Sequence, residues 1–207
     1  MADGHNTPLP LGATDVFELR PRIGFASTAL ARRIPGNERT LDVVMTASYS
    51  VTGRWNENYD EVDVRRAQRV LREWHLDGFE DRLFGTLSDG ERKRTQIARA
   101  VMPDPELLLL DEPVASLDPA TAQSVLTLLH DICKKDRLTA IVSLHQVNLA
   151  RMFADRIVGL RQGQVVFDGT AAQLTEEAQS ALYAKSSPAN MGSQFDSPSQ
   201  SKEFLPC

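Results

Sequence analysis

The sequence is poor in cysteine and has no long apolar run. Only Cys133 and Cys207 occur among its 207 residues, which excludes a disulfide framework and favours a reducing compartment. No stretch approaches the roughly 18 consecutive apolar residues that cross a bilayer. The first residues, MADGHNTPLPLG, lack the basic and apolar regions of a secretory signal. We therefore expect a cytoplasmic protein with no direct membrane insertion.

An excess of positive charge is also lacking. The formal net charge is −5, with acidic and basic residues mixed along the chain. A broad basic face for nucleic acid is therefore not expected, and we expect no nucleic-acid partner. The length suits one domain with a sizeable core.

The composition changes along the chain and suggests three parts. Residues 1–14 are expected to form a loose lead-in, residues 15–184 the folded domain, and residues 185–207, rich in Ser, Pro and Gln, a disordered tail. Within the domain, residues 40–80 are expected to form a small helical subdomain. There TLDVVMTA begins a helical pattern, and after a loop EVDVRRAQRVLREWHL repeats apolar residues near helical spacing, at Val62, Ala67, Val70, Leu71 and Trp74.

The other segments alternate between strand and helix patterns. RIGFAS (residues 22–27), LLLLDEP (residues 107–113) and TAIVSLH (residues 139–145) predict short strands, the last two of them buried. ATAQSVLTLLHDICKK and VNLARMFA predict helices, and DRIVGLRQGQVVFDG predicts a hairpin that turns at Gly163. This order predicts an α/β fold with a parallel sheet and right-handed crossovers.

Two predicted strands end in side chains that can carry phosphate chemistry. Asp111 and Glu112 follow one strand and His145 the next, so in a parallel sheet all three would emerge at the same edge. Asp111 suits Mg²⁺, Glu112 could orient or deprotonate an attacking water, and His145 could contact a γ-phosphate. Solvated acids at a strand end are the plain alternative for Asp111 and Glu112 taken alone.

The stretch TLSDGERKRTQIARA, residues 86–100, predicts the start of a helix. Ser88 and Glu91 form the sequence pattern of a capping box, but Gly90 in the first turn costs roughly 1 kcal/mol relative to alanine. A helix N-terminus with a glycine lets an anion approach the backbone amides closely. We interpret Gly90 as a sign of phosphate binding, because capping alone does not explain it.

Four motifs in this order resemble those of ABC-type ATPases. They are LSDGE (the signature), LLLLDEP (Walker B), SLD at residues 116–118 (the D-loop) and His145 (the switch histidine), with about 20 and 35 residues separating signature glycine, Walker B aspartate and histidine. The resemblance covers residues 15–184. It implies a P-loop NTPase-like parallel sheet with an inserted helical subdomain, truncated at its N-terminus.

The same resemblance implies a set of site residues and partners. ATP and Mg²⁺ would be the ligands, with Asp111 at the metal, Glu112 and His145 catalytic, and nucleotide contacts from Thr28 (at the Q-loop), Leu87, Ser88, Asp89, Gly90, Glu91 and Asp118. Family members form head-to-tail dimers, in which the signature of one subunit meets the ATP on the P-loop of the other. They dock through the helical subdomain on a membrane permease, and so lie peripherally at the inner face of the membrane.

A finer resemblance concerns the C-terminal half. EPVASLDP and SLHQVNLARMFADRIVGLRQGQVVFDG are similar to the ATP-binding subunits of phosphonate or phosphate-ester importers. The first half, up to FEDRLFGTLSDGERKR, is more similar to another ABC branch. The chain is therefore interpreted as a join of two lineages near the Walker B strand.

One expected motif does not occur. The sequence contains no GxxxxGK[ST], and only about 20 residues precede the segment that matches the Q-loop strand, too few for a strand, P-loop and helix. We expect weak ATP binding and poor stability of the chain alone. Three hypotheses remain: a transport ATPase subunit whose P-loop comes from elsewhere, a non-catalytic partner that offers its signature face, and an inactive fragment.

Overall fold

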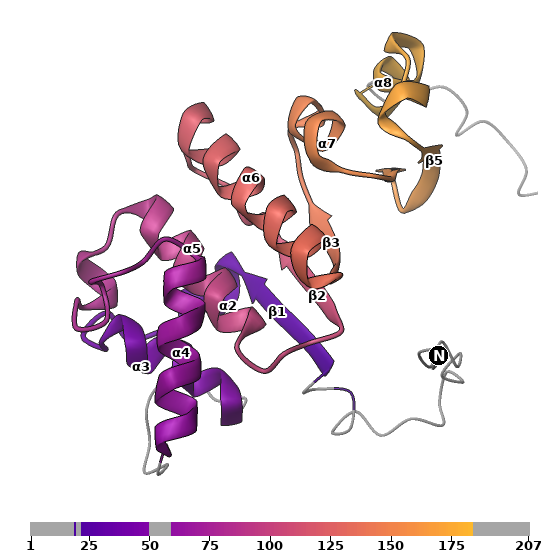
Figure 1. Ribbon diagram of the computed structural model, residues 1–207. Coiled ribbons are helices and arrows are strands. Elements are labelled where there is room, and N and C mark those ends of the chain that lie inside the picture. The colour runs from indigo at the N-terminus through magenta and orange to yellow at the C-terminus, as the bar shows by residue number, and fades with distance from the viewer. Residues whose placement is uncertain (1–18, 20–21, 50–58, 184–207) are drawn as a thin grey trace, which may run out of the picture.

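The computed structural model describes residues 19, 22–49 and 59–183, which form an α/β arrangement (Figure 1). The expected lead-in and tail lie outside the described residues. Within the part of the chain that is described, no helix has both the length and the apolar character to cross a membrane. In chain order the elements are β1 (Ile23–Ser27), α2 (Thr28–Ala31), α3 (Thr40–Met45), η2 (Thr46–Tyr49), α4 (Glu61–Glu73), η3 (Phe84–Thr86), α5 (Asp89–Val101), β2 (Leu107–Asp111), α6 (Pro119–Asp136), β3 (Thr139–Ser143), α7 (Val147–Phe153), β4 (Ile157–Arg161), β5 (Gln164–Gly169), η4 (Ala171–Gln173) and α8 (Glu176–Tyr183).

Three strands form a parallel sheet in the order β1-β2-β3. The three predicted strands and their parallel arrangement are thereby confirmed. In the register of the sheet, Asp111 at the end of β2 lies beside Ser27 of β1 and Ser143 of β3. The C-terminal ends of all three strands consequently meet at one edge, where the backbone stops pairing and side chains are free to contact a ligand.

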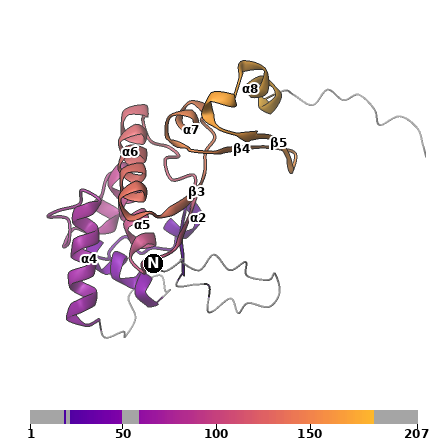
Figure 2. The same ribbon diagram turned by 45° about the vertical axis from the view of Figure 1, so that its right-hand side comes forward.

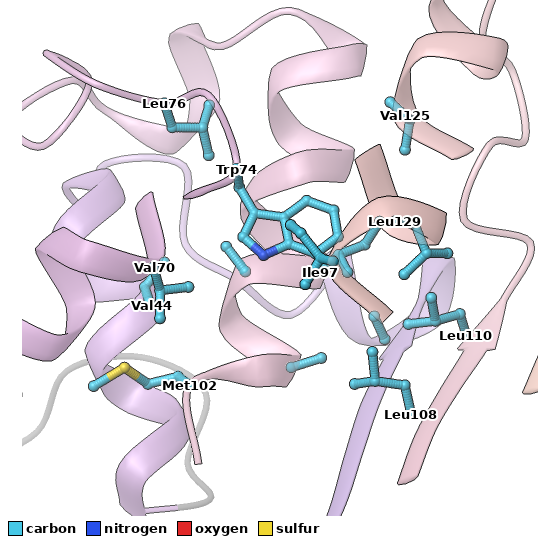
Figure 3. Close-up of a cluster of buried hydrophobic side chains, with 14 of the residues drawn as sticks. Val44, Val70, Trp74, Leu76, Ile97, Met102, Leu108, Leu110, Val125 and Leu129 are labelled. Atoms are coloured by element: carbon cyan, nitrogen blue, oxygen red, sulfur yellow. The ribbon is translucent and has the colours of Figure 1, made fainter. Parts of the chain in front are cut away.

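The main core lies between the sheet and the helices that precede and follow β2. Figure 3 shows Trp74 at its centre, with Ile97 of α5, Leu129 of α6 and Leu108 of β2 around it. The helix α5 approaches β1 so closely that a Cβ on Gly24 would collide with the carbonyl oxygen of Ala100. Close approach of helix to strand is the reason for a glycine within β1.

The helical segment begins at Thr40, as the pattern predicts. Asp60 caps α4 by accepting hydrogen bonds from the amides of Val62 and Asp63, both within 2.9 Å. Four of the five apolar side chains in this pattern are buried, whereas Val62, in the first turn of α4, is 61% exposed.

The strand β3 is not buried, contrary to the prediction from its apolar run. Its residues alternate between exposed and half-buried, and Ile141 is 60% exposed. Within the described residues β3 pairs with β2 on one side only. An apolar run predicts a strand buried on both faces only when other elements cover those faces, and here one face has no cover.

The predicted hairpin is confirmed. β4 and β5 pair antiparallel, and Gln162 and Gly163 between them have φ values of 52° and 77°, as a tight hairpin turn requires. In Figures 1 and 2 the hairpin lies with α7 and α8 on the side of the molecule away from α3 and α4.

Candidate functional site

Glu112 and His145 meet at the C-terminal edge of the sheet. Nε2 of His145 lies 2.5 Å from Oε1 of Glu112, and Asp111 precedes Glu112 as the last residue of β2. The expectation that Asp111, Glu112 and His145 share one edge therefore agrees with the structure. Their side chains are open to solvent, with 82% of the His145 side chain exposed, so a ligand can reach the pair.

Ser143 organises the two carboxylate residues. Its hydroxyl donates to Oδ1 of Asp111 at 2.7 Å and accepts the backbone N–H of Glu112 at 3.0 Å. Glu112 itself has φ 49°, in the left-handed region that residues other than glycine rarely adopt. Sequence reasoning missed Ser143, because only the register of β2 on β3 shows that it lies beside Asp111.

Thr28 reaches the same edge from β1. It is the first residue of α2, directly after Ser27, and its hydroxyl accepts a hydrogen bond from Nζ of Lys93 at 3.3 Å. The same Nζ donates to the backbone carbonyl of Glu112 at 3.1 Å. Burial lowers the pKa of Lys93, while the nearby charges of Glu112, Asp89 and Asp111 act in the opposite direction. Lys93 was not among the predicted site residues, since no glycine-rich loop precedes it.

The capping box at the start of α5 is confirmed. The backbone N–H of Ser88 donates to Oε2 of Glu91 at 2.7 Å, and the hydroxyl of Ser88 accepts the N–H of Glu91 at 3.4 Å. Burial acts to raise the pKa of Glu91, but the hydrogen bonds from Ser88 and the charges of Arg82 and Arg94 outweigh it and hold that pKa below its ordinary value. The first turn of α5 is thus fixed by its own side chains.

Gly90 has a structural explanation that the sequence did not show. It is buried, and a Cβ at this position would lie 2.7 Å from the Cγ2 methyl of Thr121 in α6. The argument that only phosphate binding explains Gly90 was therefore wrong, because close packing of α5 on α6 also requires a small residue. A role for the Gly90 backbone at a phosphate stays a prediction.

The remaining expected contacts have local structural roles in this chain. Leu87 is 2% exposed and packs with Ile34, Val43 and Phe84, so its side chain is not available to a ligand. Asp89 accepts a hydrogen bond from Arg92. Asp118 caps α6 by accepting the backbone N–H groups of Ala120 and Thr121; hydrogen bonding by Thr121 is the main cause that lowers the pKa of Asp118.

The structure therefore places the expected residues in two groups and one separate position. Thr28, Asp111, Glu112 and His145 lie at the sheet edge, residues 88–91 form the tip of α5 directly after the buried Leu87, and Asp118 is the N-cap of α6. Lys93 of α5 supplies hydrogen bonds that join α5 to the sheet edge.

The oxygen atoms at the sheet edge suit a hard cation. The described residues include no group of three or more His, Cys, Asp and Glu that could enclose a metal. Asp111 and the hydroxyl of Ser143 nevertheless offer neighbouring oxygen donors, exposed at a strand end. Mg²⁺ keeps several waters and commonly takes one or two protein oxygens, so this small donor set fits it.

Comparison with known proteins identifies relatives for much of the chain. Residues 21–115 match the family described as ABC transporter. The phosphonates import ATP-binding protein PhnC 2 of Cupriavidus metallidurans is 65% identical over 127 residues, which are 58% of this chain and 46% of that protein. PhnC 1 of Rhodopseudomonas palustris (strain HaA2) is 39% identical over 180 residues, 84% of this chain and 63% of that protein. The chain spans about half to two thirds of the length of these relatives.

Solved structures show the same fold. An ABC transporter of metal-chelate type, in an inward-facing conformation, matches with a TM-score of 0.68 and 28% identity, over 78% of this chain and 64% of that one. A dimeric ATP-binding cassette with ADP and Pi in a post-hydrolysis state matches with a TM-score of 0.62 and 28% identity, over 77% of this chain and 68% of that one. The predicted fold class is thereby confirmed.

The similarity to phosphonate import proteins extends further along the chain than expected. A match over 84% of the chain has to include much of its first half, so the similarity is not limited to the C-terminal half. Whether the two halves come from two lineages stays an untested interpretation.

Proposed function

We propose, from the premise that this chain belongs to the ABC transporter family, that it is an ATP-binding subunit that couples ATP hydrolysis to the import of phosphonates or related phosphorus oxyanions. The observation that carries the proposal is the contact of 2.5 Å between Glu112 and His145, beside Asp111, at the carboxyl edge of a parallel sheet. The printed names of the relatives supply the substrate class.

Each residue at the edge has a distinct task in this proposal. The Glu112 carboxylate orients a water toward the terminal phosphate and accepts its proton. His145 holds Glu112 by their hydrogen bond and faces the terminal phosphate. Asp111, oriented by Ser143, holds Mg²⁺, which when bound neutralises charge on the phosphates. The amides at the tip of α5, with Ser88, serve the ATP of a partner subunit.

The phosphate cradle has to come from residues outside these 207, because the sequence contains no GxxxxGK[ST]. Two observations favour that arrangement. The chain spans 46% and 63% of the two PhnC relatives. In addition, β3 has one strand neighbour in the described residues and exposes Ile141 at 60%. A strand that carries the cradle would pair with β3, and the helix that follows the cradle would cover the face of the sheet that bears this side chain.

The proposed assembly contains further partners. A second ATP-binding subunit would join head to tail, as the dimeric neighbour suggests, and a permease would contact the helical segment 40–80. The chain would then be cytoplasmic and peripheral at the inner face of the membrane, held there by the permease.

The test is complementation of the phosphate cradle. The full chain is co-expressed with an added segment that contains a strand, a GxxxxGK[ST] loop and the helix after it, and phosphate release is measured with MgATP. We expect turnover that Glu112→Gln reduces at least about 100-fold, as for a lost general base. Glu73→Gln, which removes the exposed ion pair with Lys135, is the matched control and should leave turnover unchanged. Turnover that is equal in the Glu112→Gln complex would remove Glu112 from its role.

A second candidate is a non-catalytic partner, which the exposed position of Ser88 at the tip of α5 favours. Such a partner would offer Ser88 and Gly90 to a complete ATPase subunit. Mixing the chain with an intact relative separates the two functions. If only the signature face acts, Ser88→Arg suppresses the turnover of the relative and Glu112→Gln is silent.

A further inference from the structure

Lys93 connects three elements at the candidate site. It lies in the second turn of α5, partly buried, and its ammonium group donates to the backbone carbonyl of Glu112 at 3.1 Å and to the hydroxyl of Thr28 at 3.3 Å. Burial disfavours its charge, and the carboxylates of Glu112, Asp89 and Asp111 favour it. A partly buried cation at this place needs oxygen acceptors, and the structure supplies them from β1–α2 and from the end of β2.

The Glu112 backbone needs support on both sides. Its φ of 49° is unfavourable for a residue with a Cβ. The Glu112 N–H donates to Oγ of Ser143 at 3.0 Å, while the Glu112 carbonyl accepts Nζ of Lys93 at 3.1 Å and the N–H of Ala115 at 3.2 Å. Strained backbone persists where the surroundings over-determine it, and here two side chains from α5 and β3 hold the two sides of one residue.

We propose that Lys93 is a positioning residue, whose ammonium group holds the backbone of Glu112 in the left-handed conformation that directs its carboxylate to His145. Lys93 acts through Glu112 and touches no reacting atom. Its importance for hydrolysis rests on the proposed function, but its effect on the Glu112–His145 contact does not.

Lysine suits this task because of its shape and its donors. The ammonium carries three N–H groups on a flexible stem, so it can reach oxygens of two elements from one helix position. Methionine has a similar length and no donor. Lys93→Met therefore removes the hydrogen bonds while it retains most of the packing of the stem.

The first experiment is a double-mutant cycle on the full chain, measured by urea denaturation without nucleotide. Lys93→Met should raise the unfolding equilibrium constant about tenfold, as expected for lost hydrogen bonds from a charged donor. In the Glu112→Gly background Lys93 retains both acceptors, the backbone carbonyl of residue 112 and the Thr28 hydroxyl, so the same change should again have about a tenfold effect. In the Glu112→Gln background, which retains the Cβ and removes the charge, the effect should stay near tenfold.

The second experiment measures the Glu112–His145 contact directly by NMR. The imidazole ¹⁵N resonances of His145, assigned with His145→Gln, should shift in Lys93→Met toward their positions in Glu112→Gln. Lys134→Met is the control, because it also removes a lysine ammonium group with its hydrogen bonds, those to Asp155, but from α6. This control should leave the His145 resonances unchanged.

The outcomes decide the proposal in both directions. Unshifted His145 resonances in Lys93→Met, or a stability effect of Lys93→Met that disappears in the Glu112→Gln background, overturn it, because the second result would mean that Lys93 acts on the carboxylate charge and not on the backbone. If Lys93→Met does not fold, Lys93→Gln, which retains an N–H donor, takes its place, and failure of both to fold also overturns it. None of these measurements needs ATP, so a failure of the proposed ATPase function would be recognised separately.

Discussion

Trp74 and Leu160 are both large apolar side chains, but one is 0% and the other 65% exposed. The same difference in exposure is found for other apolar side chains in the two regions that contain them. The helical region of α3, α4 and α5 buries Val43, Val44 and Leu71 almost completely, whereas β3 and the β4–β5 hairpin expose Ile141 and Leu160. The helical region packs its apolar side chains on one another, on β2 and on α6, whereas β3 and the hairpin leave large apolar side chains exposed.

The largest expected effect is a loss of stability from a change in the buried helical region. Trp74→Ala removes a fully buried indole and should lower the free energy of unfolding by about 3–5 kcal/mol. Leu160→Ala, on the exposed hairpin, should change it by less than about 0.5 kcal/mol. Urea denaturation measures both, and similar values for the two variants would contradict the contrast between the regions.

A smaller effect tests why Gly90 is a glycine. The new methyl of Gly90→Ala meets the Cγ2 atom of Thr121, so we expect a loss of about 1–2 kcal/mol, even though alanine favours helix. Thr121→Ser removes that methyl, and the double variant should recover most of the loss. If Gly90→Ala alone stabilises the chain by about 1 kcal/mol, packing does not explain the glycine.

The pH dependence of stability should show the capping box. Because the folded pKa of Glu91 lies below its ordinary value of about 4.3, its contribution is present above that pH and is lost as the pH falls through the lower folded pKa. Glu91→Gln retains a capping side chain without the charge. The melting temperature should therefore fall less steeply between about pH 6 and pH 3 for Glu91→Gln than for the wild type. Parallel falls of the two melting temperatures would argue against a charge-dependent contribution of Glu91.

The smallest effect concerns the exposed strand. Ile141→Thr keeps a β-branched residue on β3 and should change the stability of the chain alone by less than about 0.5 kcal/mol. In the complementation experiment the same variant should weaken the association, because the added segment would cover the face of β3 that bears Ile141. A loss of stability above 2 kcal/mol in the chain alone would show that Ile141 is already buried in solution.

Particular residues show how much of the structure could be predicted from the sequence. The capping box of Ser88 and Glu91, the hairpin turn at Gly163 and the strand end at Asp111 follow from local spacing, and each is found in the structure. The third strand, β3, ends at Ser143, two residues before the predicted end at His145. The positioning contacts of Ser143 and Lys93 could not be predicted, because they depend on strand register and on the approach of α5 to the sheet edge.

The sequence alone determined the elements, the parallel sheet and the family, because spacing along the chain fixes helix faces, strand ends and motif order. Only the tertiary structure decided that Gly90 packs on Thr121, that Leu87 is buried in a small core, and that Ile141 is exposed. The physical reason is that burial and close contact belong to pairs of distant segments, and a local pattern contains no information about which segment will cover which face.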